Sequence, residues 1–146
     1  MKKLVTWVLI ADGSQARVFR AAGKGKIEEM SEMAVAHPPT RDMVSDRPGR
    51  TFDSMGQGRH AMEAPSDPHD KAEADFLRSV AKKLDASCQR KEFDRLVVVA
   101  PPRALGTLRS VFSEKLTSAV TQEIPHDLTG FKTPALDARL KEYGVV

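Results

Sequence analysis

Residues 96–124 read LVVVAPPRALGTLRSVFSEKLTSAVTQEI, and this stretch decides the fold class. It begins with five consecutive apolar residues that end at Pro101, which indicates a buried strand. Apolar residues at helical spacing follow and predict one amphipathic helix over 105–116. Residues 119–124 are predicted to form the next strand. The stretch is therefore expected to be a βαβ unit with a right-handed crossover.

The N-terminal third predicts three more strands. Residues 4–11 are apolar apart from Thr6, as expected of a central strand. Turn residues at 12–14 and 23–26 separate this run from strands expected at 17–20 and 27–33, which gives a meander. Two lysines before an apolar run also resemble a signal peptide, but the run is short and charged residues follow it, so we favour the strand. No run approaches the roughly 20 residues of a membrane span.

A long helix is predicted to begin near Pro68, because Asp67 can cap it and Pro68 suits the first helical position. Apolar residues then recur every four positions as far as Cys88. A short closing helix is expected from Thr133 and should end by Gly144. The order β-β-β-α-β-α-β-α predicts a three-layer α/β fold with a mixed five-stranded sheet, as in ribonuclease-H-like proteins. We expect one domain over residues 1–146.

Composition limits the function classes only broadly. The net charge is +3, from 23 basic and 20 acidic residues, which is too small an excess to indicate nucleic-acid binding by itself. The single cysteine, Cys88, rules out an intramolecular disulfide framework and fits the reducing cytoplasm.

Because the order of strands and helices is ribonuclease-H-like, the first enzyme class to consider is a metal-dependent nuclease. Such a site needs several converging carboxylates, and Asp12, Glu73 and Asp75 are the candidates. The strand at 96–100 is followed by Pro101, Pro102 and Arg103, with no carboxylate where one is needed. We therefore interpret Asp12 as a turn residue. The scattered histidines and the lack of a phosphate-loop motif predict neither a metal nor another cofactor.

Residues 36–66 show neither helical nor strand periodicity, and so long a connection is usually functional or disordered. Within it, residues 45–62 read SDRPGRTFDSMGQGRHAM. Arginine can bind phosphate bidentately, glycine allows a ligand to approach the backbone, and histidine titrates near neutrality. These features predict an anion- or RNA-binding loop formed by Arg47, Arg50, Gly56, Gly58, Arg59 and His60. The alternative is that Asp46 and Asp53 pair with the arginines in a purely structural role.

Four segments resemble the bacterial host attachment protein family: WVLIADG at 7–13, VSDRPGR at 44–50, RHAME at 59–63 and FDRLVVVAPPR at 93–103. The resemblance extends from Trp7 to about Leu140. It implies a cytosolic protein without a known biochemical activity. It also implies a fold similar to the middle domain of archaeal and eukaryotic class-1 peptide release factors. That domain carries a Gly-Gly-Gln loop before its long helix, and here Met55-Gly56-Gln57-Gly58 lies in the corresponding place.

Three functions follow as hypotheses. We favour an auxiliary cytosolic factor that contacts structured RNA or the ribosome through residues 41–62, with Arg47, Arg50 and Arg59 on phosphates and Arg103 in support. The second is ribosome-dependent hydrolysis of peptidyl-tRNA, in which Gln57 positions the water, as the resemblance implies. The third is an adaptor for protein partners in an attachment pathway.

Overall fold

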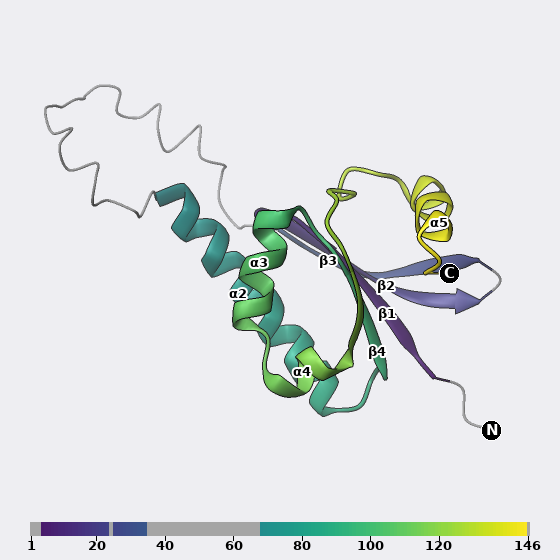
Figure 1. Cartoon of the computed structure of the whole chain (residues 1–146), viewed down its shortest axis with the longest axis horizontal. Coiled ribbons are helices and arrows are strands. Elements are labelled where there is room, and N and C mark those ends of the chain that lie inside the picture. Colours follow the sequence, from purple (N-terminus) through teal and green to yellow (C-terminus); the bar gives the residue numbers. More distant parts are fainter. Residues whose placement is uncertain (1–3, 24, 35–67, 146) are drawn as a thin grey trace, which may run out of the picture.

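The computed structural model describes residues 4–23, 25–34 and 68–145, which form a mixed five-stranded sheet with helices on both faces (Figure 1). The strands are β1 (Thr6–Ala11), β2 (Gln15–Gly23), β3 (Lys26–Ala34), β4 (Arg95–Val99) and β5 (Val120–Ile124). Their spatial order is β3-β2-β1-β4-β5. Strands β1 to β3 form an antiparallel meander, β4 is parallel to β1, and β5 is parallel to β4. The predicted three-layer α/β fold is confirmed.

The two apolar runs form the two strands at the centre of the sheet. Residues 8–11 of β1 have no exposed surface, because alternate side chains enter different cores. Leu9 belongs to the core on one face, while Val8 and Ile10 belong to the core on the other. Strand β4 divides its valines in the same way. Burial on both faces is why neither strand shows the alternation of a half-exposed strand.

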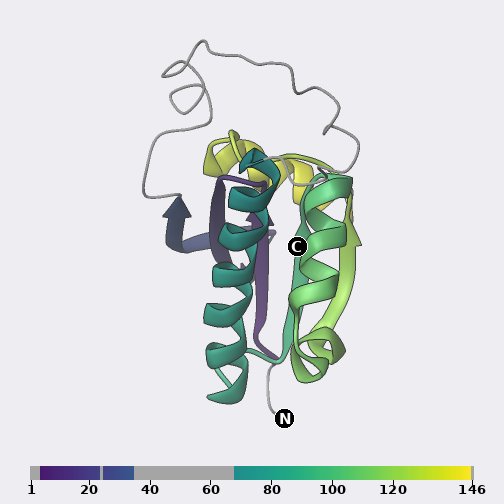
Figure 2. The ribbon, with the colours of Figure 1, turned by 90° about the vertical axis from the view of Figure 1, so that its left-hand side faces the viewer.

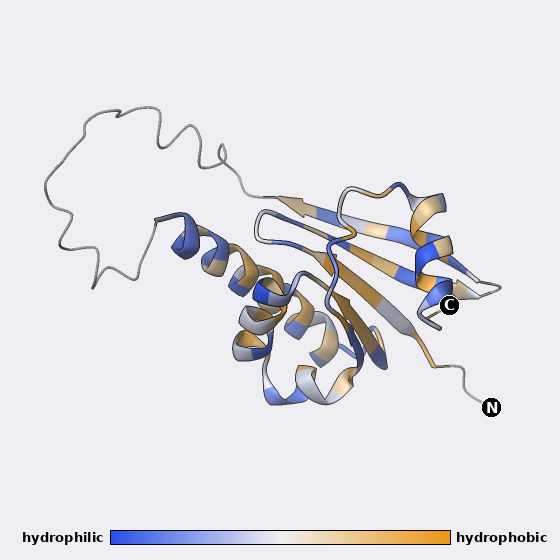
Figure 3. Ribbon diagram, turned by 45° about the horizontal axis from the view of Figure 1, so that its top comes forward, coloured by the Kyte–Doolittle hydropathy of each residue, from blue (hydrophilic) through white to orange (hydrophobic). Residues whose placement is uncertain are grey.

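Helices α2 (Pro68–Gln89), α3 (Pro102–Val111) and α4 (Glu114–Ala119) cover one face of the sheet, and α5 (Thr133–Glu142) covers the other (Figures 1 and 2). The predicted stripe of α2 is buried at Phe76, Val80, Leu84 and Cys88. Figure 3 shows apolar colour concentrated on the central strands and hydrophilic colour on the outer faces of the helices. No helix among the described residues has the length and apolarity needed to cross a membrane.

The prediction of one helix over 105–116 is wrong, because two helices share these residues. Helix α3 ends at Val111, and Phe112 has an extended backbone. Ser113 then caps α4 by accepting a hydrogen bond from the Leu116 N–H at 3.1 Å. The Ser113 hydroxyl also donates to Asp85 of α2 at 2.5 Å, which fixes the break against the longer helix. The apolar spacing alone did not reveal it because Leu108 and Leu116 face the same core.

The remaining boundaries differ from the predictions by only a few residues. The meander strands extend beyond the expected 17–20 and 27–33, and the last strand begins at Val120. The closing helix begins at Thr133 as predicted and is followed by Gly144, whose φ of 75° suits a glycine after a helix. Helix α2 begins at Pro68, while the predicted cap, Asp67, lies outside the described residues.

Candidate functional site

The carboxyl ends of the parallel strands meet at one edge of the sheet, which we call the carboxyl edge. Ile10 of β1 is paired with Val99 of β4, so the residues that follow both strands lie together. Strand β3 ends there too, because Ala34 is paired with Gln15. In open α/β sheets this edge is where ligands bind, since the connecting segments there are free to vary.

Two helices begin at the carboxyl edge and are joined by an ion pair. Asp70, in the first turn of α2, pairs with Arg103, in the first turn of α3. Glu73 of α2 lies against the turn after β1, because a Cβ atom added to Gly13 would be only 2.5 Å from the Glu73 Cδ. His69 Nε2 lies 3.0 Å from the Glu73 carboxylate. The described chain therefore stops at Ala34 and resumes at Pro68, both at this edge.

Asp12 follows β1 at the carboxyl edge, and both of its carboxylate oxygens accept hydrogen bonds from within the fold. Its Oδ1 accepts hydrogen bonds from the N–H groups of Ser14 and Gln15 at 2.8 and 2.9 Å, which closes the turn after β1. Its Oδ2 lies 3.0 Å from the Thr129 hydroxyl. The interpretation of Asp12 as a turn residue is confirmed, and it also ties β1 to the segment between β5 and α5.

That segment is fixed from the other side by a buried arginine. Arg17 of β2 is only 9% exposed, and its Nη1 donates to the carbonyls of Thr129 and Phe131. Its Nε and Nη2 bind the Glu29 carboxylate bidentately, each at 3.0 Å. The guanidinium also lies 5.0 Å from the centre of the Phe19 ring. Arg17 therefore positions residues 129–131 from inside the fold.

The three carboxylates considered for a metal site do not come together. Asp12 faces the turn and Thr129, Glu73 faces Gly13 and His69, and Asp75 lies on the exposed side of α2. The hydrogen bond from Lys71 lowers the pKa of Asp75, and Arg78 pairs with it as well. Across residues 4–23, 25–34 and 68–145, no group of three His, Cys, Asp or Glu side chains could hold a metal ion.

Of the residues predicted to bind RNA or to support that binding, the structure places Arg103. Its side chain is 69% exposed at the carboxyl edge and pairs with Asp70. The others lie outside the described residues: Asp46, Arg47, Arg50, Asp53, Gly56, Gln57, Gly58, Arg59 and His60. Their predicted roles stay predictions.

Sequence analysis missed Arg17 and Thr129, whose hydrogen bonds hold residues 129–131 in place beside the carboxyl edge. The bonds of Arg17 to Thr129 and of Thr129 to Asp12 each span more than 100 residues of the chain, so no local pattern reveals them. The one local signal is that Arg17 alternates with the buried Ala16 and Val18, which puts a charge on the other face of a core strand. Asp127, two residues before Thr129 and 2.7 Å from its hydroxyl, is a recognisable turn signal.

The interactions of Asp12 lead to a prediction about its role. Replacing Asp12 with Ala should lower the free energy of unfolding by about 1–3 kcal/mol, because backbone donors of the turn lose their acceptor. Asp12→Asn, whose amide oxygen can accept the same bonds, should cost much less. Urea unfolding with and without Mg²⁺ measures both effects. A midpoint that Mg²⁺ raises in the wild type but not in Asp12→Asn would contradict the structural role.

Comparisons with known proteins identify the sequence and the fold separately. Residues 7–140 match a protein family described as "protein required for attachment to host cells". A search of curated proteins finds no sequence match.

Among solved structures, the archaeal translation termination factor aRF1 is similar over 97% of this chain, with a TM-score of 0.50 and 11% sequence identity. This chain covers 40% of aRF1. Two structures from Aquifex aeolicus also match. The type II variant of the Ppx/GppA phosphatase has a TM-score of 0.42 and 12% identity over 84% of this chain and 36% of its own. The PPX-GPPA enzyme has a TM-score of 0.41 and 14% identity over 83% and 36%. At these identities the likeness concerns the fold alone, and the predicted similarity to release factors in fold is confirmed.

Proposed function

This chain belongs to the family of proteins required for attachment to host cells, and on that premise we propose that it is a cytosolic auxiliary factor that contacts structured RNA, above all the ribosome. The contact is made from the carboxyl edge by residues 41–62, with Arg103 beside them. In this proposal the protein binds RNA without catalysing a reaction, and its role in attachment follows from that binding.

The observation that carries the proposal is where residues 35–67 are attached. The described residues that flank this segment, Ala34 and Pro68, both lie at the carboxyl edge. The sequence between them includes Arg47, Arg50 and Arg59 together with three glycines. Guanidinium groups match the geometry of phosphate oxygens, and glycines let a nucleic-acid backbone come close. A rigid sheet edge thus presents a segment whose composition suits phosphate binding.

Arg103 is the described residue best placed to add to such a contact. Its partner Asp70 is 37% exposed and its own side chain is 69% exposed, so the pair sits largely in water. Exposed pairs of this kind contribute about 0–1 kcal/mol. A phosphate can therefore replace Asp70 as the partner of Arg103 at little cost. Helices α2 and α3 also begin at this edge, so the positive ends of their dipoles favour an anion there.

The likeness to aRF1 favours the ribosome over other RNAs and supports a second candidate function. That protein is a translation termination factor, and this chain shares the fold of two fifths of it. In the second candidate, Gln57 positions water for ester cleavage of peptidyl-tRNA in a site completed by ribosomal RNA. A Gln57→Ala variant that binds ribosomes but fails to release peptide would distinguish cleavage from binding alone.

Co-sedimentation with ribosomes tests the favoured function. We expect the purified protein to pellet with ribosomes at low salt and to be released at moderate salt, because phosphate contacts displace counterions. Replacing Arg47, Arg50 and Arg59 together with Ala should strongly reduce pelleting at the same salt concentration.

The matched control replaces three exposed arginines elsewhere, namely Arg78, Arg95 and Arg109, and so removes the same charge. This control variant should pellet like the wild type. Equal binding by the wild type and the Arg47/Arg50/Arg59 variant would exclude these arginines as the contact. Absence of binding at low salt would remove both RNA functions and leave the adaptor function.

A further inference from the structure

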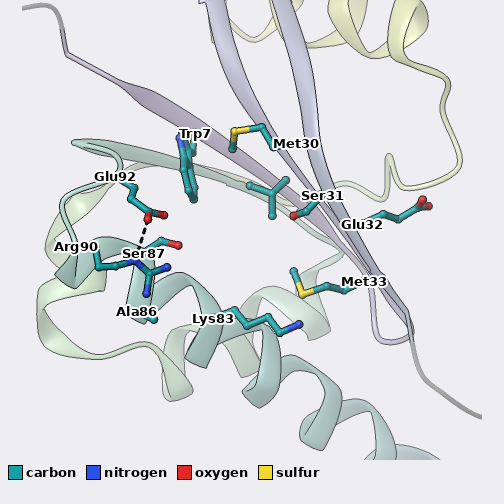
Figure 4. Close-up of a pocket in the computed structure, with 11 residues that line it drawn as sticks. Trp7, Met30, Ser31, Glu32, Met33, Lys83, Ala86, Ser87, Arg90 and Glu92 are labelled. Atoms are coloured by element: carbon teal, nitrogen blue, oxygen red, sulfur yellow. Dashed lines mark hydrogen bonds and ion pairs between the residues drawn. The ribbon is translucent and has the colours of Figure 1, made fainter.

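A groove separates the edge strand β3 from helix α2, on the face of the sheet that α2 covers (Figure 4). Its volume is about 580 Å³, within the range of sites that hold a ligand or a short peptide segment. The sheet side contributes Trp7 and Met33, and Figure 4 shows both directed into the space between sheet and helix. The helix side contributes Lys83, Ser87 and Arg90.

The apolar side chains that line the groove remain partly exposed to solvent. Trp7 is half-buried and packs on Phe93, with ring centres 4.7 Å apart. Met30 is 40% exposed, and Leu4 is the only other large apolar residue so exposed in the described part of the chain. Met30 lies at a β-bulge, because Glu29 is paired with Phe19 and Ser31 with the adjacent Val18. A bulge re-aims the side chain it carries, here beside the open edge of the sheet.

Within residues 4–23, 25–34 and 68–145, no strand pairs with the outer backbone edge of β3 beside the groove. One end is closed, because the Ile27 N–H donates to Asp137 of α5 at 2.9 Å. From Glu28 to Ala34, bonds to other described residues run to β2 only. An open edge strand next to an apolar groove is the arrangement that binds an extended peptide as an added strand.

The charges on β3 disfavour pairing with the β3 strand of a second copy of this chain. Antiparallel pairing of two β3 strands about Met30 would put Glu28 opposite Glu32, and like charges opposite one another are destabilising. The edge therefore suits a strand that brings basic side chains.

Two charged residues at the groove lack an ion-pair partner among the described residues, and they lie on opposite faces of the sheet. Glu28 is paired with Arg20, Glu29 with Arg17, and Arg90 with Glu92. Lys83, on α2, has no such pair. Glu32 has none either, although it is attracted by the charge of Arg17, which lies opposite it in the register. Side chains of an added strand point alternately to the two faces. Its groove-facing side chains would meet Lys83 and the apolar wall, and the others would meet Glu32.

We propose that this groove binds an extended segment of a partner protein, which pairs with β3 as an added strand. Every second residue of the segment faces the groove, and one of these is a large apolar residue that inserts between Trp7 and Met33. The residues between them are basic. An acidic side chain on the groove-facing side pairs with Lys83. None of the residues that line the groove is assigned to the RNA contact, so the inference stands independently of RNA binding.

Two synthetic peptides of identical composition test the proposal. The first, KVKFKDKV, alternates basic residues with apolar and acidic ones, and the second, KKKKVFDV, does not. Trp7 is the only tryptophan of the chain, so its fluorescence reports on the groove alone. We expect saturable quenching or a shift of Trp7 emission with the alternating peptide and binding at least tenfold weaker with the permuted one.

Two charge reversals on neighbouring exposed residues of α2 complete the test. Lys83→Glu should weaken binding of the alternating peptide by about tenfold, since it turns an attraction into a repulsion. Lys82→Glu makes the same charge change outside the groove lining and should leave the affinity unchanged. An unchanged Trp7 signal at millimolar peptide, equal binding of both peptides, or equal effects of the two reversals would overturn the proposal. Ribosome binding should be the same in both variants.

Discussion

Replacing Arg17 with Met is expected to lower the free energy of unfolding by about 3 kcal/mol, the low end for breaking a buried ion pair. Arg17 is 9% exposed and donates to the Glu29 carboxylate and to the carbonyls of Thr129 and Phe131. Methionine fills part of the volume but leaves these acceptors without a donor. The Glu29 side chain is 32% exposed and regains some water, which limits the cost. Urea unfolding at neutral pH measures the change.

The matched control for this variant is Arg109→Met. Arg109 pairs with Glu123, but its side chain is 61% exposed, so its loss should cost far less stability than the loss of Arg17. Equal effects of the two substitutions would show that Arg17 does not hold residues 129–131 as the structure indicates.

The pH dependence of stability provides an independent check on the same pair. The hydrogen bonds from Arg17 lower the pKa of the Glu29 carboxyl below its ordinary value of 4.5. Just below pH 4.5 the unfolded chain therefore binds more protons at this residue than the folded chain does. The contribution of the pair is fully present above this pH and is lost as the pH falls through the lower, folded-state pKa. Arg17→Met should lose less stability than the wild type over that acidic range.

The second large loss of stability is expected when a core side chain beneath α3 is truncated. Leu108 has no exposed surface and belongs to the core shared by the sheet, α2 and α3. Leu108→Ala should lower the free energy of unfolding by about 2–5 kcal/mol, through lost burial and the cavity left behind. Thermal or urea unfolding measures this loss.

Leu4→Ala makes the same chemical change at a residue that is 53% exposed, and it should alter stability by less than about 0.5 kcal/mol. Similar losses for Leu108→Ala and Leu4→Ala would contradict the packing of α3 on the sheet.

The sequence predicted most of the fold because its strongest signals are local. The apolar runs of β1 and β4 and the four-residue spacing along α2 report on burial directly. The break between α3 and α4 was missed because Leu108 and Leu116 continue one apolar stripe across it. The cap formed by Ser113 outweighs that continuity, and a serine followed by Glu114 was the local sign of it.

The candidate site was predictable in part only. Arg103 and the ends of residues 35–67 follow from the positions of strands and helices along the chain. Arg17 donates to the carbonyls of Thr129 and Phe131, and Asp12 accepts from the Thr129 hydroxyl, each across more than 100 residues of the chain. A single sequence holds no record of such pairing. The groove likewise depends on how far β3 extends past α2, which periodicity does not specify.

The salt dependence of ribosome binding tests the central claim most directly. The logarithm of the binding constant falls with the logarithm of the salt concentration by about 0.7–0.9 for each phosphate contact. The wild type and the Arg47/Arg50/Arg59→Ala variant are titrated against ribosomes over the same range, with salt low enough for the variant to bind. We predict that the slope of the variant is smaller by about 2 to 3, one contact for each arginine lost. Identical slopes would show that these arginines touch no phosphate and would contradict RNA binding at the carboxyl edge.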